Sequence, residues 1–203
     1  MRKLLLAFCA FATICSAGAQ WKPAGDKIKT DWAEKVDPRN VLPEYPRPGM
    51  ERADWQNLNG EWEYAILPKG QVEPTSFDGN ILVPFAVESS LSGVQKEVGE
   101  KNELWYKRTF TVPSSWKDIL LNFGAVDWKA DVFVNDILIG SHTGGFTPFS
   151  LNITPYLNGK STHKLVVRVW DPSDKGYQPR GKQVANPEGI WYTPVTAIWQ
   201  TVC

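Results

Sequence analysis

Acidic residues on two long loops are the side chains best suited to chemistry in this sequence. Two carboxyl groups ~5–9 Å apart supply the acid, base or nucleophile of glycoside hydrolysis. The loops expected at 84–103 and 171–194 carry the candidates: Glu88, Glu97, Glu100, Glu103, Asp171, Asp174 and Glu188. The sequence does not say which of them meet in space, and most are expected to be solvated loop acids. Asp171, followed by Pro172, is expected to cap the turn after a strand.

Other chemistries have less support. The only two histidines, His142 and His163, are far apart in the sequence, and no cysteine pair accompanies them, so we predict no metal site and no cofactor. The sequence contains neither a G-x-S-x-G elbow nor a G-x-x-x-x-G-K-[ST] loop. Its 22 basic and 22 acidic residues balance. A neutral chain does not favour a nucleic-acid partner.

The elements that must position these side chains are predicted to be β-strands. Short runs that alternate or are continuously apolar recur along the chain, at 60–66, 80–84, 104–112, 119–123, 130–134, 165–170 and 195–203. Within 132–140, two apolar runs flank Asn135-Asp136, a pair that tolerates the positive φ of a hairpin turn. No long stretch has helical periodicity. We therefore predict an all-β protein of about nine strands, a sandwich or jelly roll.

The N-terminal segment has the features of a signal peptide. Arg2 and Lys3 precede a short apolar stretch, and Ala17-Gly18-Ala19 gives a cleavage pattern. We predict a signal peptide over 1–19 and export to the periplasm or the extracellular space. A lipoprotein with Cys15 as its lipidated residue is the alternative, disfavoured because Ile14 stands where a small residue is expected. No other window is long and apolar enough to span a membrane.

An irregular N-terminal arm is predicted over 20–50. It holds five prolines, and YPRPG at 45–49 is incompatible with a helix or a central strand. We expect this arm to lie along the domain surface, with Trp21 and Trp32 pinning it there.

Six stretches in order resemble the N-terminal jelly-roll domain of glycoside hydrolase family two, which includes β-galactosidases and β-glucuronidases. They are LNGEW at 58–62, VPF at 83–85, LWYKRTF at 104–110, FGAV and VFVN within 123–135, GGFTPF followed by ITPYL within 144–157, and the run from GIW at 189–191 through Ile198-Trp199. The resemblance covers roughly 50–203. It implies a galactose-binding-like β-sandwich over 51–203.

The resemblance also implies what surrounds such a domain. In the family an immunoglobulin-like domain and a (β/α)₈ barrel follow, and the barrel carries the catalytic glutamates. A barrel takes ~250 residues, which is more than this chain has. We therefore expect no catalytic residue here, a chain truncated at or near the last strand of the jelly roll, and those two domains as partners. Whether the chain is itself an enzyme stays open.

Sugar contacts are expected on the second long loop. A family aspartate that contacts sugar hydroxyls lies six residues before the glycine of the last motif, and Gln183 stands there in this sequence. The departure speaks against galactose specificity and against the sodium site of some relatives. Arg180 and Lys182 would make this corner positive, which would suit an acidic sugar. Trp105 and Trp191 are further candidates, because an aromatic face can stack on a sugar ring.

The leading hypothesis is thus a non-catalytic, carbohydrate-binding domain of an exported β-galactosidase-like enzyme that acts on oligosaccharides or glycosides. Two alternatives remain: a stand-alone carbohydrate-binding module, and a truncated product without a function of its own.

Overall fold

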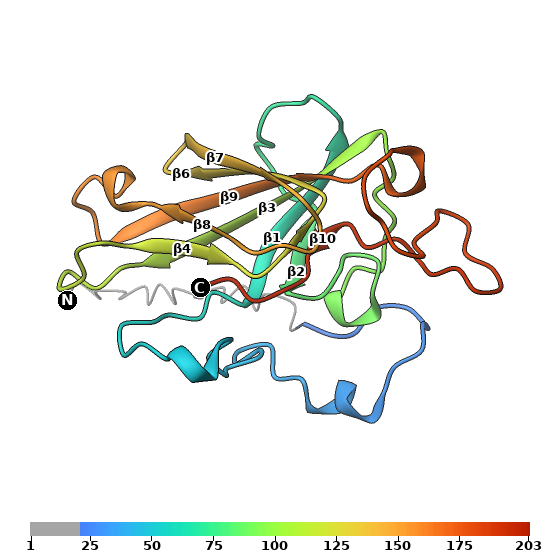
Figure 1. The fold of residues 1–203 in the computed structure, drawn as a ribbon, viewed down its shortest axis with the longest axis horizontal. Helices are drawn as coiled ribbons and strands as arrows, with labels where there is room; N and C mark the ends of the chain where they lie inside the picture. Colours follow the sequence, from blue (N-terminus) through green and yellow to red (C-terminus); the bar gives the residue numbers. More distant parts are fainter. Residues whose placement is uncertain (1–20) are drawn as a thin grey trace, which may run out of the picture.

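A computed structural model describes residues 21–203; the predicted signal peptide, including Cys9 and Cys15, lies outside them. A six-stranded antiparallel sheet dominates the described part, in the order β2-β1-β3-β9-β6-β7 (Figure 1). Its strands are β1 (Gly60–Pro68), β2 (Gly79–Val83), β3 (Asn102–Thr111), β6 (Lys129–Val134), β7 (Ile137–Thr143) and β9 (Thr162–Trp170). The strands predicted from sequence in these regions are confirmed.

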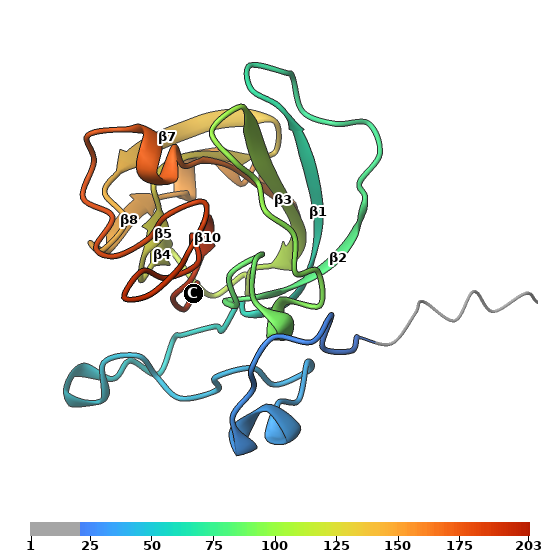
Figure 2. The same ribbon diagram turned by 90° about the vertical axis from the view of Figure 1, so that its right-hand side faces the viewer.

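Two short strand pairs form the second layer. They are β4 (Leu120–Phe123) with β8 (Phe149–Asn152), and β5 (Val126–Asp127) with β10 (Ala197–Ile198). Figure 2 shows this layer facing β1 and β3 across the interior. The all-β sandwich prediction is therefore correct. The strand predicted at 119–123 is confirmed as β4, whereas β5 and β8 were not predicted. The two residues of β5 are too few for a periodicity to stand out.

The alternation of β3 separates two apolar clusters. Leu104, Tyr106 and Phe110 face the main core between the layers. Trp105 points to the other face of the large sheet, where it packs with Ala65 and Val166. Side chains of successive strand residues point to opposite faces, so one strand contributes to both clusters.

The hairpin between β6 and β7 turns where the sequence predicts. Asn135 and Asp136 have φ values of 50° and 71°. The Asn135 side chain also donates to the Tyr156 carbonyl oxygen at 2.8 Å and accepts from the Lys164 amide at 3.1 Å. These bonds tie the turn to two neighbouring segments.

The predicted strand at 195–203 is wrong as one continuous element. Only Ala197–Ile198 is regular, and a further bridge joins Val202 to Phe123. Between these pairings, residues 199–201 lie opposite only 124–125, which is a β-bulge. A Cβ on Gly124 would stand 2.6 Å from the Gln200 Cβ, so the bulge fits only against a glycine.

Residues 21–59 contain no strand and run beneath the sandwich in Figure 1. They include two 3₁₀ helices, η1 (Asp31–Lys35) and η2 (Pro48–Met50); the other three are η3 (Ser90–Ser92), η4 (Thr154–Tyr156) and η5 (Ser173–Lys175). Backbone bonds hold the segment: the Ala24 amide donates to Ser90 O at 2.8 Å. Trp21 is half-buried against Gly93, as expected, whereas Trp32 is 71% exposed and pins nothing.

Among residues 21–203, no helix has the length and apolar character needed to cross a membrane.

Candidate functional site

Two long loops meet at one end of the sandwich, which we call the loop end. They are the segments 84–101, after β2, and 171–196, after β9. Both lie on the right of Figure 1 and face the viewer in Figure 2. The meeting is direct, because the Thr196 amide donates to both carboxyl oxygens of Glu88, at 3.0 and 3.1 Å. The structure thus brings together two loops that the sequence places far apart, and the prediction that they carry binding residues stays a prediction.

Three buried carboxyl groups lie beneath the loop end: Glu88, Asp127 and Asp171, which we call the carboxyl cluster. Each is at most 3% exposed. Asp171 accepts from the Ser173 amide at 2.8 Å and from the Thr196 hydroxyl at 3.3 Å. The expected turn cap by Asp171 is therefore confirmed. Thr196 contacts both Glu88 and Asp171, so one residue ties the end of the second loop to two of the three carboxyls.

Burial shifts the protonation of the whole cluster. It raises the pKa of the Glu88 carboxyl from 4.5 to about 8, and the nearby Asp171 carboxyl adds to the rise. Burial and the charge of Asp171 likewise raise the pKa of Asp127 from 3.8 to about 7. Burial also raises the pKa of Asp171. An ionised carboxylate in a poorly solvated site is costly without a cation, so the neutral forms are favoured.

Gln183 joins this cluster through its amide. Its Nε2 donates to the Asp127 carboxylate at 3.2 Å, and its Oε1 accepts from the Val195 amide at 2.6 Å. The Gln183 side chain therefore links β5 to the end of the 171–196 loop. Gly145 leaves room for the Asp127 carboxyl, since a Cβ there would overlap it. This contact gives the GGFTPF stretch a structural role at the loop end.

Three other residues named from sequence lie on the same loop as Gln183. Arg180 donates to the Asp174 carbonyl oxygen at 2.9 Å. Lys182 is exposed, with its ammonium 5.8 Å from the centroid of the Tyr192 ring. Trp191 is 42% exposed. These side chains give the loop a basic and aromatic outer surface, and their contact with sugar stays a prediction.

Trp105 lies elsewhere. It is 2% exposed on the outer face of the six-stranded sheet, stacked with Phe133 at 6.3 Å between ring centroids. The Arg168 guanidinium lies 5.4 Å from its ring centroid. Neither ring face is open, so Trp105 is a core residue here and has no surface for a sugar.

Of the seven candidate acids, only Glu88 and Asp171 enter the carboxyl cluster. Glu103, expected on the first loop, lies instead on β3, and the other four lie on the two loops outside the cluster. Sequence reasoning missed Asp127, which comes from β5. The available signal was that two acids, Asp127 and Asp131, stand inside the largely apolar run 123–134, because an acid buried in such a run usually has a polar partner.

The carboxyl cluster is closed to a solvent-borne substrate. Its members are buried, and their hydrogen-bonding partners belong to the protein. Among residues 21–203, no group of three His, Cys, Asp or Glu side chains is arranged to hold a metal ion. The cluster therefore acts as an anchor for the 171–196 loop, and the exposed surface of that loop is the part available for binding.

Comparison with known proteins places the chain in a family. The family model described as "Glycosyl hydrolase 2 galactose-binding domain-like" matches residues 78–193, more than half of the chain. The chain belongs to this family. The match contains every strand from β2 to β9 and nearly all of both loops that meet at the loop end.

Relatives of this galactose-binding-like domain are larger proteins. A β-galactosidase of Thermoanaerobacter pseudethanolicus is 29% identical over 140 residues, which are 64% of this chain and 19% of the relative. A β-glucuronidase of Paenibacillus borealis is 28% identical over 118 residues, 54% of this chain and 20% of the relative. The solved structure of Lactobacillus rhamnosus β-glucuronidase matches at 30% identity and a TM-score of 0.49, covering 57% of this chain and 21% of that one. The chain thus spans about a fifth of the length of these relatives.

Proposed function

We propose that this chain is the N-terminal carbohydrate-binding domain of an exported, β-galactosidase-like enzyme that hydrolyses O-glycosidic bonds. The catalytic residues would lie in a barrel outside this chain, with an immunoglobulin-like domain between. Membership of the galactose-binding-like family and the names of the relatives support this proposal. The closed carboxyl cluster agrees with it, since the buried acids of this chain are placed to hold a loop rather than to attack a substrate.

One observation carries the proposal: the 171–196 loop is anchored from below and presents exposed side chains above. Thr196 and Gln183 tie it to Glu88, Asp171 and Asp127. Its outer surface offers Lys182, Trp191 and Tyr192. A pre-organised loop with cationic and aromatic groups can orient a sugar at low entropic cost. The basic corner would suit an acidic sugar.

Kinetics on the complete glycosidase that carries this domain test the proposal. Trp191→Ala and Lys182→Ala are each expected to raise KM about tenfold, because a lost contact worth ~1.4 kcal/mol changes affinity by that factor. Trp32→Ala, which removes an exposed tryptophan of the arm, is the matched control and should leave KM unchanged. Assays should include both β-galactosides and β-glucuronides. Hydrolysis by the 203-residue chain itself, lost in Glu88→Gln, would contradict the proposal.

Export is part of the proposal and depends on the first 19 residues of the sequence. Cell fractionation followed by N-terminal sequencing tests it. We expect a product that begins at Gln20 in the periplasm or the medium. A cytoplasmic product that retains Met1, or a lipidated Cys15, would contradict it.

A second candidate function, a stand-alone carbohydrate-binding module, is favoured by one feature. Tyr177 and Tyr192 are each at least 64% exposed on one loop. Exposed aromatic rings provide flat faces for sugars. Calorimetry of the 203-residue chain with galactosides, glucuronides and plant oligosaccharides decides: the absence of heat with all of them would remove this candidate.

A further inference from the structure

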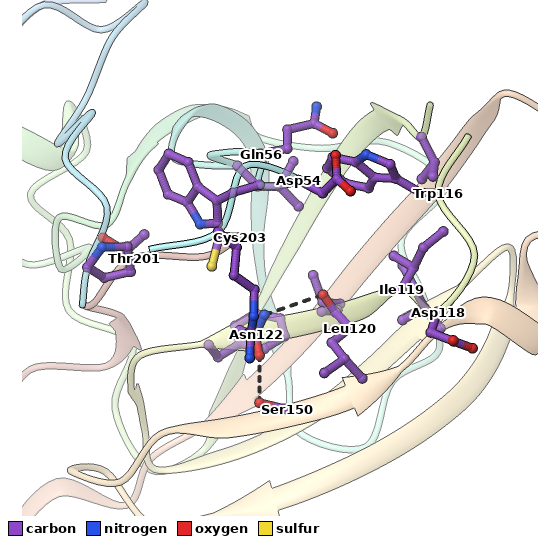
Figure 3. A pocket seen from close by; sticks show the side chains of 18 of the residues that line it. Asp54, Gln56, Trp116, Asp118, Ile119, Leu120, Asn122, Ser150, Thr201 and Cys203 are labelled. Atoms are coloured by element: carbon purple, nitrogen blue, oxygen red, sulfur yellow. Dashed lines mark hydrogen bonds between the residues drawn. The ribbon is translucent and has the colours of Figure 1, made fainter. Parts of the chain in front are cut away.

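Two hollows on the sandwich differ in the chemistry of their walls. The groove beside β4 has a floor of apolar side chains from the main core, among them Ile119 (Figure 3). A smaller cleft of about 90 Å³ lies on the outer face of the six-stranded sheet, and we call it the outer-face cleft. Its lining is one indole and five charged side chains: Lys69, Glu103, Lys129, Asp131, Arg168 and Trp170. The outer-face cleft is therefore the hollow suited to a polar ligand.

Strand alternation gathers four of these side chains on one face of the sheet. Val169 packs in the main core, so Arg168 and Trp170 on either side of it point to the outer face. Across the sheet Lys129 pairs with Trp170, and Asp131 pairs with Arg168. Residues directly opposite share a face, so the two pairs lie side by side. Two regular strands, β6 and β9, thus fix the positions of these side chains.

The cations of the cleft outnumber its carboxylates. Lys69, Lys129 and Arg168 carry three positive charges against the two negative charges of Glu103 and Asp131, which leaves one in excess. Arg168 is committed to Asp131, since its Nε and Nη2 donate to one carboxylate oxygen at 3.1 and 2.6 Å. Within residues 21–203 neither lysine forms a salt bridge. A single negative charge on a ligand would therefore balance the cleft.

Glu103 restricts the kind of anion that fits. Its side chain is 6% exposed, and its Oε2 accepts from the Gly70 amide at 3.1 Å. For the other carboxylate oxygen the structure records no donor in the described part of the chain. A carboxylate repels a bare anion but accepts a strong hydrogen bond from a hydroxyl group. A ligand that carries both a carboxylate and hydroxyl groups would satisfy the lysines and Glu103 together.

Trp170 adds an apolar surface to the cleft. Its Nε1 donates to Glu100 O at 2.8 Å, which holds the ring in place. The Lys69 ammonium lies 3.1 Å from the ring centroid. Because lysine has a flexible four-carbon stem, this ammonium can turn toward an anion beside the ring and leave the ring face to the C–H groups of a sugar.

We propose that the outer-face cleft binds a uronic acid unit of a polysaccharide, with the carboxylate beside Lys69 and Lys129 and a hydroxyl group donating to Glu103. The cleft has room for about three water molecules, so it takes the carboxylate-bearing edge of the sugar ring and leaves the rest in solvent. This goes beyond the proposed function, whose sugar contacts lie on the 171–196 loop. A second contact on the same chain strengthens the hold on a polymer, because it raises the effective concentration at the first.

Titrations of the 203-residue chain with three small probes test the proposal. Methyl β-glucuronide offers a carboxylate and hydroxyl groups, methyl β-glucoside offers hydroxyl groups alone, and acetate offers a carboxylate alone. The indole N–H signals of Trp170 and Trp191 in NMR spectra, assigned with Trp170→Phe and Trp191→Phe, report on the cleft and on the loop end separately. We expect the glucuronide to shift the Trp170 signal with an affinity about tenfold or more above that of either other probe, because each of these lacks charge-assisted hydrogen bonds that the glucuronide makes.

Three variants separate the contacts. Lys129→Gln removes an exposed cation and should weaken glucuronide binding at Trp170 about fivefold, while the Trp191 signal keeps its response. Lys160→Gln, an exposed lysine between η4 and β9, is the matched control and should change neither signal. Glu103→Gln should lower the affinity for the glucuronide relative to acetate, because the neutral amide accepts a weaker hydrogen bond and no longer repels an anion.

Equal affinities of acetate and the glucuronide at Trp170 would overturn the proposal, because the cleft would then recognise an anion alone. So would equal affinities of the glucoside and the glucuronide, an unchanged affinity in Lys129→Gln, or no response of Trp170 to any probe. Failure here would leave the proposed glycosidase function standing, because its kinetic tests change Trp191 and Lys182. Failure of those kinetic tests would leave the result at Trp170 standing.

Discussion

The loop end and the groove beside β4, whose floor includes Phe110, Ile119, Leu121 and Ile153, belong to the same sandwich but are held together by different interactions. At the loop end, buried carboxyls and hydrogen bonds anchor a long irregular segment. At the groove, apolar side chains of the main core form the floor. The contribution of buried acids to stability depends on pH, whereas that of apolar packing does not. The stability of the loop end should therefore change with pH, whereas that of the groove should change when apolar side chains are removed.

The largest effect is expected at the groove floor. Leu121→Ala removes a core side chain that is 1% exposed, and such truncations cost about 2–5 kcal/mol. Leu120→Ala, on the next residue and half-exposed, should cost less than ~0.5 kcal/mol. Urea unfolding of both variants measures the contrast, which should persist unchanged between pH 5 and pH 8.5. Similar losses for the two variants would show that the groove floor is not part of the core.

Stability should fall as pH rises because of the loop end. The pKa of Glu88 is raised on folding from 4.5 to about 8, so its contribution is fully present below pH 4.5 and is lost as pH rises through about 8. The same sign holds for Asp127, from 3.8 to about 7. We expect the free energy of unfolding to decrease between pH 5 and pH 8.5 by an amount on the order of a few kcal/mol.

Glu88→Gln assigns this loss to its source. The neutral amide keeps an acceptor for the Thr196 amide and cannot ionise. The free energy of unfolding of the variant should therefore decrease less over the same pH range, and above pH 8 it should be larger than that of the wild type. Glu188→Gln, an exposed acid of the neighbouring loop, is the control and should follow the wild-type profile. A Glu88→Gln profile as steep as that of the wild type would remove Glu88 as the titrating group.

The bulge between the two regions should be sensitive to a single methyl group. Gly124→Ala places a Cβ 2.6 Å from the Gln200 Cβ, and overpacking of this kind costs about 1–3 kcal/mol. Gly49→Ala is the control, because nothing lies within 4 Å of a Cβ at that position. Thermal unfolding of the two variants gives the comparison. A Gly124→Ala variant as stable as the control would mean that residues 199–201 can move away at no cost.

The large sheet could be predicted because its signals are local. The alternation in 104–112 and the Asn135-Asp136 turn follow from side-chain period and backbone preference, and neither needs a distant partner to be recognised. The run 195–203 contains the right residues for a strand, yet its ladder is interrupted. The cause is the pairing of 199–201 with 124–125, which the sequence of either segment alone does not reveal.

The two long loops could be predicted from the sequence, but their meeting at the loop end could not. The sequence does not say which loop residues meet, and in the structure Glu88 and Asp171 meet through Thr196. Their meeting with Asp127 depends on how β5 and the loops pack, so spacing alone could not reveal it. Trp105 shows the opposite case. An exposed tryptophan could stack on a sugar ring, but Trp105 lies on β3 and packs in the second apolar cluster. Phe133 and Arg168 lie against its ring, and this contact distinguishes a core residue from a sugar-binding one.

The smallest effect should come from Thr196, the residue that joins two members of the carboxyl cluster. Its hydroxyl donates to Asp171 over 3.3 Å, long for an O–H···O bond, so Thr196→Val should cost about 0.5–1 kcal/mol. Thr196→Ser keeps the hydroxyl and should recover most of that loss. The amide bond to Glu88 survives in both variants and burial is unchanged, so stability should still fall with rising pH. The Thr196 hydroxyl lowers the pKa of Glu88 and Asp171, so this fall should be slightly steeper in Thr196→Val, whose absolute stability also drops. Urea unfolding at pH 5 and pH 8.5 measures both effects, and a Thr196→Val variant whose stability no longer falls with rising pH would mean that burial is not what raises the pKa of the cluster.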